Sequence, residues 1–294
     1  YRSMVNLVWS DLSPDDLDGI RELARVCLAA DGGLPTMAAD PSVRRFYDHT
    51  NGLVGRDATG DIVAVGAQVR DHGTHLTVTG LVDPSIRGAG VGEELLAWGR
   101  ARNPLVPLHL TVENDSEASR EFAHRTGLVR VFAEDIMRHD LGDIPVVPRD
   151  PALIAVPWGT DTRAAFHHVW RQSFGERPGF TDLDLDAWVA FVESDPEFLP
   201  ADSRLLLDGG DAVAFVTVSR DWIEQLGVVP SRRGHGLGGH LMARSLTALR
   251  KLGRQEVWLA VAEENADAHR LYGSLGFVDV GVRARYVDAT VAAD

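Results

Sequence analysis

A glycine-rich turn between an apolar run and an amphipathic segment occurs twice in this chain, and it limits the possible folds more than any other feature. The second copy, from Leu226 to Gly238, reads Leu-Gly-Val-Val-Pro-Ser-Arg-Arg-Gly-His-Gly-Leu-Gly. The first copy runs from Val82 to Gly92, and both copies fit the pattern Arg-x-x-Gly-x-Gly. A strand, a glycine turn and a helix place backbone N–H groups at a helix N-terminus, where they can bind phosphate. Two copies at corresponding places predict a tandem duplication of one α/β unit.

The order of predicted elements also repeats on the two sides of a proline-rich segment. In the first half we expect a helix that Ser13 caps, a hairpin over Leu53–Val69, a strand over His75–Val82, the glycine loop with its helix, a strand over Leu105–Val112, a helix over Ser116–His124 and a strand over Val129–His139. In the second half we expect helices over Thr160–Phe174 and Leu183–Glu193, a hairpin over Ser203–Val218, a strand over Trp222–Val229, the loop with its helix, a strand over Glu256–Ala262, a helix over Ala266–Leu275 and a strand near Val282–Val287. We therefore predict two domains, residues 4–141 and 153–294, joined by a linker over residues 142–152.

This order of elements predicts a fold of the mixed α/β (α+β) class in each half. A strand, a glycine loop with its helix, and a second strand form a right-handed βαβ crossover, so the two strands are expected to be parallel. The hairpins add antiparallel strands, and the amphipathic helices cover the sheet. Each half should therefore be a mixed sheet flanked by helices.

Charge and composition argue against several classes of partner. Of the 294 residues, 45% are hydrophobic and 24% are charged, as in a soluble globular protein. The formal net charge of −14 argues against nucleic acid or an anionic membrane as a partner, because both bind clustered Lys and Arg. No apolar stretch reaches the ~18 residues of a membrane span, and no secretory signal is recognisable, so a cytoplasmic location is expected. Cys27 is the only cysteine, which excludes an intrachain disulfide and cysteine-based metal sites.

The second half continues from its glycine loop to the segment Asn265-Ala-Asp-Ala-His-Arg-Leu-Tyr-Gly-Ser-Leu-Gly-Phe277. Together, the loop and this segment resemble the GNAT superfamily of acyl-CoA-dependent N-acyltransferases. The resemblance is specific over about Ser203–Val287 and looser over about Leu53–His139. Two such units in one chain are also similar to tandem acetyltransferases of the mycothiol synthase type, a likeness that rests mainly on architecture.

The resemblance implies that the loops bind acetyl-CoA as a co-substrate. In the family, loop N–H groups bind the pyrophosphate, and the pantetheine arm pairs with the preceding strand, which requires the two parallel strands to splay apart. The residues so implied are Leu226, Val228, Arg233, Gly234, Gly236, Leu237, Gly238 and Asn265 in the second half, and Val82, Arg87, Gly88, Gly90 and Gly92 in the first. Each loop could instead be a tight turn that binds nothing, and Asn265 could be a plain helix N-cap.

Transfer of an acyl group from a thioester to an amine requires a base and an acid. An alkylamine with a pKa of ~10.4 is ~99.9% protonated at neutral pH, so a general base must remove its proton. The departing thiolate must then be protonated. By resemblance, Tyr272 stands where the family carries the acid, and Glu224, on the strand before the loop, stands where members often carry the base. The alternatives are an aromatic packing residue for Tyr272 and a solvated carboxylate for Glu224. Nothing in this chemistry calls for a metal.

The first half lacks both candidate groups. Aligning Gly127 with Gly276 puts Ala123 at the position of Tyr272 and Ser116 at the position of Asn265, and Val78 corresponds to Glu224. The glycine loop is kept while the acid and the base are missing. We therefore predict that the first half is non-catalytic, whether or not it binds the coenzyme.

The sequence predicts an acyl-CoA-dependent N-acetyltransferase that acts in its second half on a small-molecule or peptide amine. The alternative is a tandem acyl-CoA-binding sensor or scaffold without catalysis. A nucleotide-binding βαβ protein is disfavoured because the Gly-Lys-Ser/Thr of a phosphate loop is missing. Asp182, Asp184 and Asp186 could attract a cationic acceptor, or they could only begin a helix. A monomer is mildly preferred, because two similar units in one chain can replace a homodimer.

Overall fold

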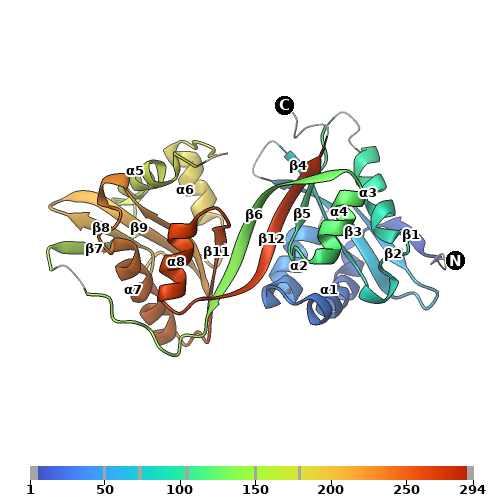
Figure 1. Cartoon of the computed structure of the whole chain (residues 1–294), viewed down its shortest axis with the longest axis horizontal. Helices are drawn as coiled ribbons and strands as arrows, with labels where there is room; N and C mark the ends of the chain where they lie inside the picture. The colour runs from blue at the N-terminus through green and yellow to red at the C-terminus, as the bar shows by residue number, and fades with distance from the viewer. Residues whose placement is uncertain are drawn as a thin grey trace. The chain divides into compact units, whose positions relative to one another are not determined.

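The structure is a computed structural model that describes residues 6–48, 51–71, 75–102, 106–148, 151–177 and 180–289. Contacts divide the chain into two compact units, residues 1–136 with 280–294 and residues 137–279, which are described separately. The sequence suggested one crossing between domains, at residues 142–152. The chain instead leaves the first unit after Ile136 and returns to it at Val280, so its C-terminal strand belongs to the first unit (Figure 1).

The first unit contains a mixed sheet with the strand order β1-β2-β3-β4-β5-β12-β6. Among the described residues, β4 and β5 pair in parallel register, and the other pairs with a described register are antiparallel. The strands are β1 (Val8–Asp11), β2 (Gly52–Arg56), β3 (Ile62–Asp71), β4 (His75–Val82), β5 (His109–Val112), most of β6 (Leu128–His139) and most of β12 (Val278–Asp288), and the helices are α1 (Leu17–Asp31), α2 (Asp40–Tyr47), α3 (Val91–Arg102) and α4 (Glu117–Arg125). Three single turns of 3₁₀ helix, Pro14–Asp16, Pro35–Ala38 and Pro84–Ile86, complete the unit.

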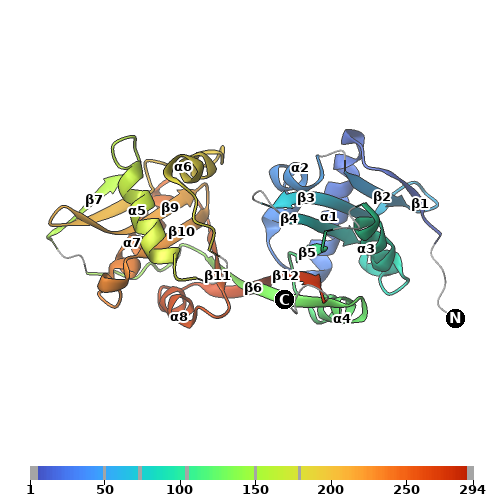
Figure 2. The same cartoon turned by 90° about the horizontal axis from the view of Figure 1, so that it is seen from above.

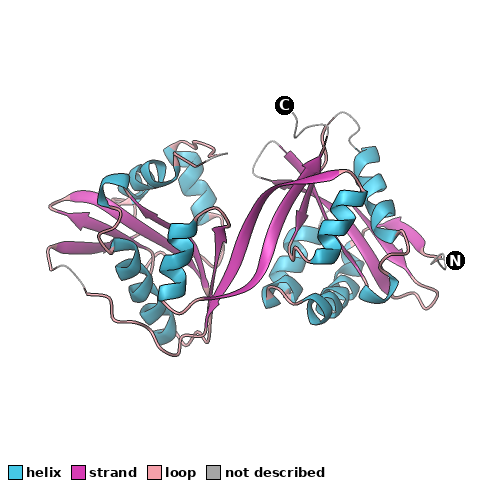
Figure 3. Ribbon diagram, viewed as in Figure 1, coloured by secondary structure: helices cyan, strands magenta, loops and turns pink. Residues whose placement is uncertain are grey.

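Helices cover both faces of this sheet because its central strand is apolar on both sides. Val65 and Ala67 of β3 are buried together with residues of α1 and α2. The alternate residue, Ala64, is buried with Leu95 of α3 on the opposite face. The sequence thus buries an apolar strand by packing helices against both faces of the sheet (Figure 3).

The second unit repeats this plan with the strand order β6-β11-β10-β9-β8-β7. Again one pair, β10 and β11, is parallel, and the other pairs with a defined register are antiparallel. The strands are β7 (Leu153–Pro157), β8 (Arg204–Asp208), β9 (Asp211–Ser219), β10 (Trp222–Val228) and β11 (Val257–Ala262), and the helices are α5 (Arg163–Phe174), α6 (Leu185–Glu193), α7 (Leu237–Lys251) and α8 (Ala266–Ser274). A 3₁₀ turn, Pro230–Arg232, precedes α7.

The residues of β10 show which helices cover which face of this sheet. A Cβ built on Gly227 would lie 2.8 Å from Ser173 Oγ of α5. Its neighbours Leu226 and Val228 point the other way, toward Gly238 at the start of α7. Helix α5 therefore lies on one face of β10 and α7 on the other, and the view from above shows the same arrangement (Figure 2).

Most predicted elements occur within a few residues of their expected bounds. One strand pairing differs from the prediction. The strand over Val129–His139 was expected to close the first half. In the first unit, however, β5 pairs in antiparallel register with β12, through Ala284 to Val287. The strand β7 and the helix α2 were not predicted. No helix in the described part of the chain is long and apolar enough to cross a membrane.

Candidate active site

The two parallel strands of the second unit separate soon after they meet. β10 and β11 are in register only at Trp222 and Trp258, and the Trp258 N–H donates to the Asp221 carbonyl at 2.9 Å. On its other edge, β10 stays paired with β9 as far as Val228. From Ile223 to Val228, the register therefore gives β10 no strand partner on the side of β11. This free edge is where an extended chain could add as another strand.

A β-bulge at Glu224 explains why the strands separate. Ile223 pairs with Val218 and Gln225 pairs with Thr217, so Glu224 is an extra residue in β10. A bulge bends its strand and increases its twist, which carries β10 away from β11. The bulge also breaks the alternation of a regular strand, which would put Glu224 on the same face as Leu226. Ile223 and Leu226 share that face, because they pair with Val218 and Val216. The Glu224 side chain is exposed.

The glycine loop of the second unit presents the bare N-terminus of α7. Gly234 and Gly236 both have φ +77°, and a Cβ on either would meet nothing within 4 Å. Glycine is therefore required here by backbone conformation and not by crowding. No side chain caps α7, whose N-cap is Gly236. The first N–H groups of a helix have no acceptor within it, so Leu237 and Gly238 begin a helix end suited to an anion.

Arg233, which the resemblance assigns to the coenzyme site, makes three contacts within the protein. Its Nε donates to the Val228 carbonyl at 3.4 Å, and its Nη2 donates to the Ser173 carbonyl near the end of α5 at 3.2 Å. Its Nη1 lies 3.4 Å from Glu176 Oε2. The guanidinium thus ties the end of β10 to the end of α5. We infer that it shapes the loop, while the loop backbone remains available for phosphate.

Helix α8 carries the remaining two candidates. The Asn265 side chain accepts a hydrogen bond from the Ala268 N–H at 3.2 Å, so Asn265 is the N-cap of α8. Tyr272 is 8% exposed, and its ring lies 5.9 Å from that of Phe277. Burial raises the pKa of Tyr272 to about 12, which the nearby positive charge of Arg177 partly opposes. The phenol is therefore fully protonated at neutral pH and can act only as a proton donor.

The end of β10, the start of α7 and helix α8 meet at Gly238. A Cβ on this glycine would lie 3.2 Å from Leu271, the residue before Tyr272, and 3.8 Å from both Leu226 and Val228. The sequence named Leu226, Val228 and Gly238 for the same site. The structure brings them together beside the helix that carries Tyr272.

One residue of this site was not singled out in the sequence. Gly227 lies inside β10, where a Cβ would come within 2.5 Å of Phe215 and 2.8 Å of Ser173. Only glycine therefore lets α5 approach the strand this closely. A glycine inside an apolar strand is a recognisable signal of such an approach.

The first unit has the same loop but a different surrounding. Gly88 and Gly90 have φ +76° and +95°, and α3 begins at Val91 as α7 begins at Leu237. Arg87 repeats the role of Arg233, because its Nε donates to the Val82 carbonyl at 2.9 Å. Gly92, which was also named for this loop, lies against Phe122. A Cβ on Gly92 would be 3.0 Å from the Phe122 ring.

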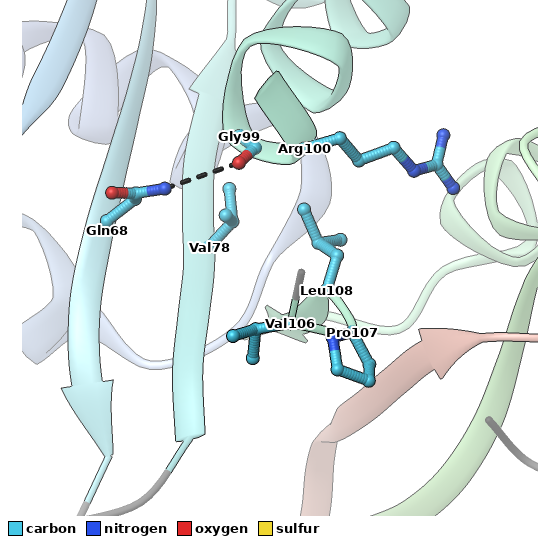
Figure 4. Close-up of a pocket in the computed structure, with 7 residues that line it drawn as sticks. All are labelled: Gln68, Val78, Gly99, Arg100, Val106, Pro107 and Leu108. Atoms are coloured by element: carbon cyan, nitrogen blue, oxygen red, sulfur yellow. Dashed lines mark hydrogen bonds between the residues drawn. The ribbon is translucent and has the colours of Figure 1, made fainter. Parts of the chain in front are cut away.

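In the first unit, apolar residues occupy the positions that correspond to Glu224 and Tyr272. The pairing of β3 with β4 has no register shift, so no bulge corresponds to the one at Glu224. Val78, which takes the place of Glu224, packs beside Gly99 and Leu108, where Gln68 donates to the Gly99 carbonyl at 3.3 Å (Figure 4). The space among these residues is about 10 Å³, roughly enough for one water molecule. Ala123 is buried at the position of Tyr272.

A splayed parallel pair, a glycine loop at a helix N-terminus and a following helix with a buried tyrosine define a class of acyl-CoA-dependent transferase. Residues 163–277 match the model of the acetyltransferase (GNAT) family. The chain is 31% identical to a mycothiol acetyltransferase of Clavibacter michiganensis, over 93% of this chain and 92% of that protein. It is 29% identical to a mycothiol acetyltransferase of Actinosynnema mirum, over 93% and 96%. The chain belongs to the GNAT acetyltransferase family and is an N-acetyltransferase.

Solved structures support the tandem architecture. A GCN5-related N-acetyltransferase from Sphaerobacter thermophilus has a TM-score of 0.81 at 21% identity, with 96% of this chain and 95% of that chain covered. A tandem GNAT protein from the clavulanic acid biosynthesis pathway has a TM-score of 0.67 at 19% identity, with 96% and 98% covered. At such low identity these likenesses concern the fold alone, and they agree with the predicted pair of mixed sheets flanked by helices.

Proposed function

We propose that the second unit transfers an acetyl group from acetyl-CoA, the co-substrate of its family, to a primary amine. The observation that carries this proposal is the free edge of β10 beside the uncapped N-terminus of α7. A strand edge suits the two amides of a pantetheine arm, and a bare helix N-terminus suits a pyrophosphate. The residues fit the coenzyme in both respects. Leu226 and Val228 would pair with the arm, and Gly234 to Gly238 would hold the phosphates.

The proton transfers are assigned to two side chains, Glu224 on β10 and Tyr272 on α8. Glu224 lies at the bulge where β10 leaves β11, and its exposed carboxylate can accept a proton from the amine directly or through water. Tyr272, protonated at neutral pH, can donate a proton to the departing sulfur. No hydrogen bond occupies the Tyr272 hydroxyl in the part of the chain that the structure describes. These roles explain why the amine can react at a pH at which it is mostly charged.

The acceptor is proposed to be the amine precursor of mycothiol, because the relatives that cover most of the chain are named mycothiol acetyltransferase. The acidic residues Asp182, Asp184 and Asp186 are not all available to attract a cationic acceptor. Asp184 caps α6 through the Ala187 N–H at 2.8 Å, and Asp182 pairs with Arg171 at 2.6 Å. Two of the three acids therefore have structural partners.

A screen of amines for CoA release tests both parts of this proposal. The screen would include the mycothiol precursor, amino sugars, polyamines and peptides, each with acetyl-CoA. Amine-dependent release, highest with the mycothiol precursor, is the expected result. Release with another amine would change the acceptor and keep the reaction. If CoA bound tightly but no amine gave release, the chain would be the acyl-CoA-binding sensor instead.

The first unit is proposed to bind no coenzyme, because its corresponding gap is bridged. The Asp31 carboxylate, at the end of α1, forms a bidentate ion pair with Arg87, which follows β4, at 2.6 and 2.8 Å. The Asp31 carbonyl accepts a hydrogen bond at 2.5 Å from Asn114, which follows β5. Asp31 thus links the ends of the two strands that would have to admit the pantetheine arm.

We therefore expect each chain to bind one molecule of CoA. Isothermal titration of the full chain with CoA should give a stoichiometry of one. Replacing Asn114 with alanine and Asp31 with asparagine would loosen the bridge, and the same titration would show whether a second, weaker site appears. A stoichiometry of two in the unaltered chain would show that the first unit admits the coenzyme despite the bridge.

A further inference from the structure

The second unit contains a cleft that lies apart from the proposed active site. Its volume is about 460 Å³, and its walls are the outer face of α7, residues 144–147 and the start of β8. The glycine loop, Glu224 and Tyr272 do not line it. We call this cleft the α7 groove.

Four cationic side chains surround the α7 groove. Arg244 and Lys251 lie seven residues apart on α7, which places them two turns apart on one face. Arg250 also comes from α7, and Arg204 begins β8. Asp202 is the one carboxylate among the lining residues. A cluster of this kind is unusual in a chain with a net charge of −14.

No ion pair neutralises these cations in the described part of the chain. Among the described residues, none of Arg204, Arg244, Arg250 and Lys251 forms an ion pair; Arg250 donates to the Gly142 carbonyl at 3.2 Å and Arg204 lies 3.4 Å from the Ser203 carbonyl. Desolvation by burial and the positive charge of Arg244 lower the pKa of Arg204, and the negative charge of Asp202 opposes this shift only in part. Two guanidinium groups that repel each other at a half-buried site would be stabilised by a bound anion.

The groove also has an unsatisfied hydroxyl and an apolar wall. Ser245 is 1% exposed, and its Oγ has no hydrogen-bond partner in the described part of the chain. A buried polar group without a partner is destabilising and points to a missing ligand or water. On the other side, Ile144, Val147 and Ala243 give the groove carbon-lined surface. This combination suits an anion that carries an organic group better than a bare ion.

We propose that the α7 groove binds a small organic phosphate. Arginine forks match phosphate oxygens, and four cations can balance the charge of a phosphate monoester or diphosphate. A long polyanion such as nucleic acid is excluded by the strongly negative charge of the rest of the chain. The ligand is distinct from the coenzyme, because the residues of the glycine loop, which form the proposed coenzyme phosphate site, do not line the groove.

Calorimetric titration of the CoA-saturated full chain with phenyl phosphate tests the proposal, with inorganic phosphate as the comparison. Saturation with CoA fills the glycine loop, so any further phosphate site must lie elsewhere. Phenyl phosphate should bind at one site, more tightly than inorganic phosphate, and the affinity should fall as salt is raised. Binding only to the CoA-free chain would mean that phenyl phosphate occupies a site that CoA fills, and it would overturn the proposal.

Variants locate the site. Replacing Arg204 and Arg244 together with glutamine should weaken phenyl phosphate binding at least tenfold. Lys251 is exposed, so Lys251→Gln removes one charge without disturbing the core. This single change should weaken the binding of phenyl phosphate severalfold. Arg25→Gln, on the exposed face of α1, removes the same charge elsewhere and should leave the affinity unchanged. Equal affinity in the unaltered chain, the double variant and Lys251→Gln would contradict the proposal.

Discussion

Replacing Tyr272 with phenylalanine is expected to lower turnover by about 10²- to 10⁴-fold with little change in the affinity for acetyl-CoA. The substitution removes one oxygen from a side chain that is 8% exposed and leaves its ring in place against Phe277. Binding should therefore survive, while the proton for the departing sulfur is lost. Turnover from CoA release and affinity from calorimetry measure the two effects separately.

The pKa of Tyr272 adds a pH signature to this prediction. Because burial raises the pKa to about 12, the phenol stays protonated at every pH below that value. A fall in rate caused by its ionisation should thus appear near pH 12 and not near pH 10. The unaltered enzyme should show no such fall through pH 10.

A matched control separates catalysis from packing. Tyr47 is also a buried tyrosine, 6% exposed, but it lies in the first unit. The change Tyr47→Phe removes the same oxygen there and should leave turnover near that of the unaltered enzyme. Unchanged turnover in Tyr272→Phe would remove Tyr272 as the acid and leave it as a packing residue.

Replacing Glu224 with glutamine is expected to slow the reaction by about 10²- to 10⁴-fold at neutral pH and to move the pH–rate profile to higher pH. Without a base, the rate follows the fraction of amine that is already neutral. For an amine with a pKa of ~10.4, that fraction rises about tenfold per pH unit up to pH ~10. The variant should therefore recover most of its rate near that pH.

The control for this change is Glu121→Gln, which removes an exposed carboxylate from α4 of the first unit. Its rate and pH profile should match those of the unaltered enzyme. If the profile of Glu224→Gln does not move, another group is the base or the acceptor arrives neutral, and the assignment of Glu224 is wrong.

Local features of this site could be predicted from the sequence because neighbouring residues determine them. Gly234 and Gly236 adopt positive φ, as a turn before an uncapped helix requires. Ser116 and Asn265 are both N-caps of corresponding helices, which agrees with the alignment of the two halves. The apolar replacements Val78 and Ala123 were also visible, and the structure places both in buried contacts.

Features set by residues far apart could not be predicted in this way. The bulge at Glu224 depends on how β9 and β10 pair, and the alternation of residues along β10 alone does not reveal an extra residue in that strand. The position of β12 beside β5 was missed because β6 and β12 have similar patterns, and either could complete the sheet. The bridge through Asp31 joins two strand ends to a helix, and none of its residues stands out in the sequence.

The arginines of the loop pattern have the same structural role in both units. Arg87 and Arg233 occur at matching positions, and a basic residue in a phosphate loop suggests contact with phosphate. Within the protein, both donate to the carbonyl that ends the preceding strand. Their spacing from the glycines reflects the shape of the turn, which both units share.

The central claim is that acetyl transfer takes place in the second unit alone. Gly236→Val and Gly90→Val test it as a matched pair, because both glycines have positive φ, precede a helix and have open space around them. Each valine imposes the same backbone strain, but only one strains the proposed coenzyme loop. Amine-dependent CoA release should fall at least a hundredfold in Gly236→Val and stay within about twofold in Gly90→Val. Equal losses in the two variants, or a greater loss in Gly90→Val, would contradict the account.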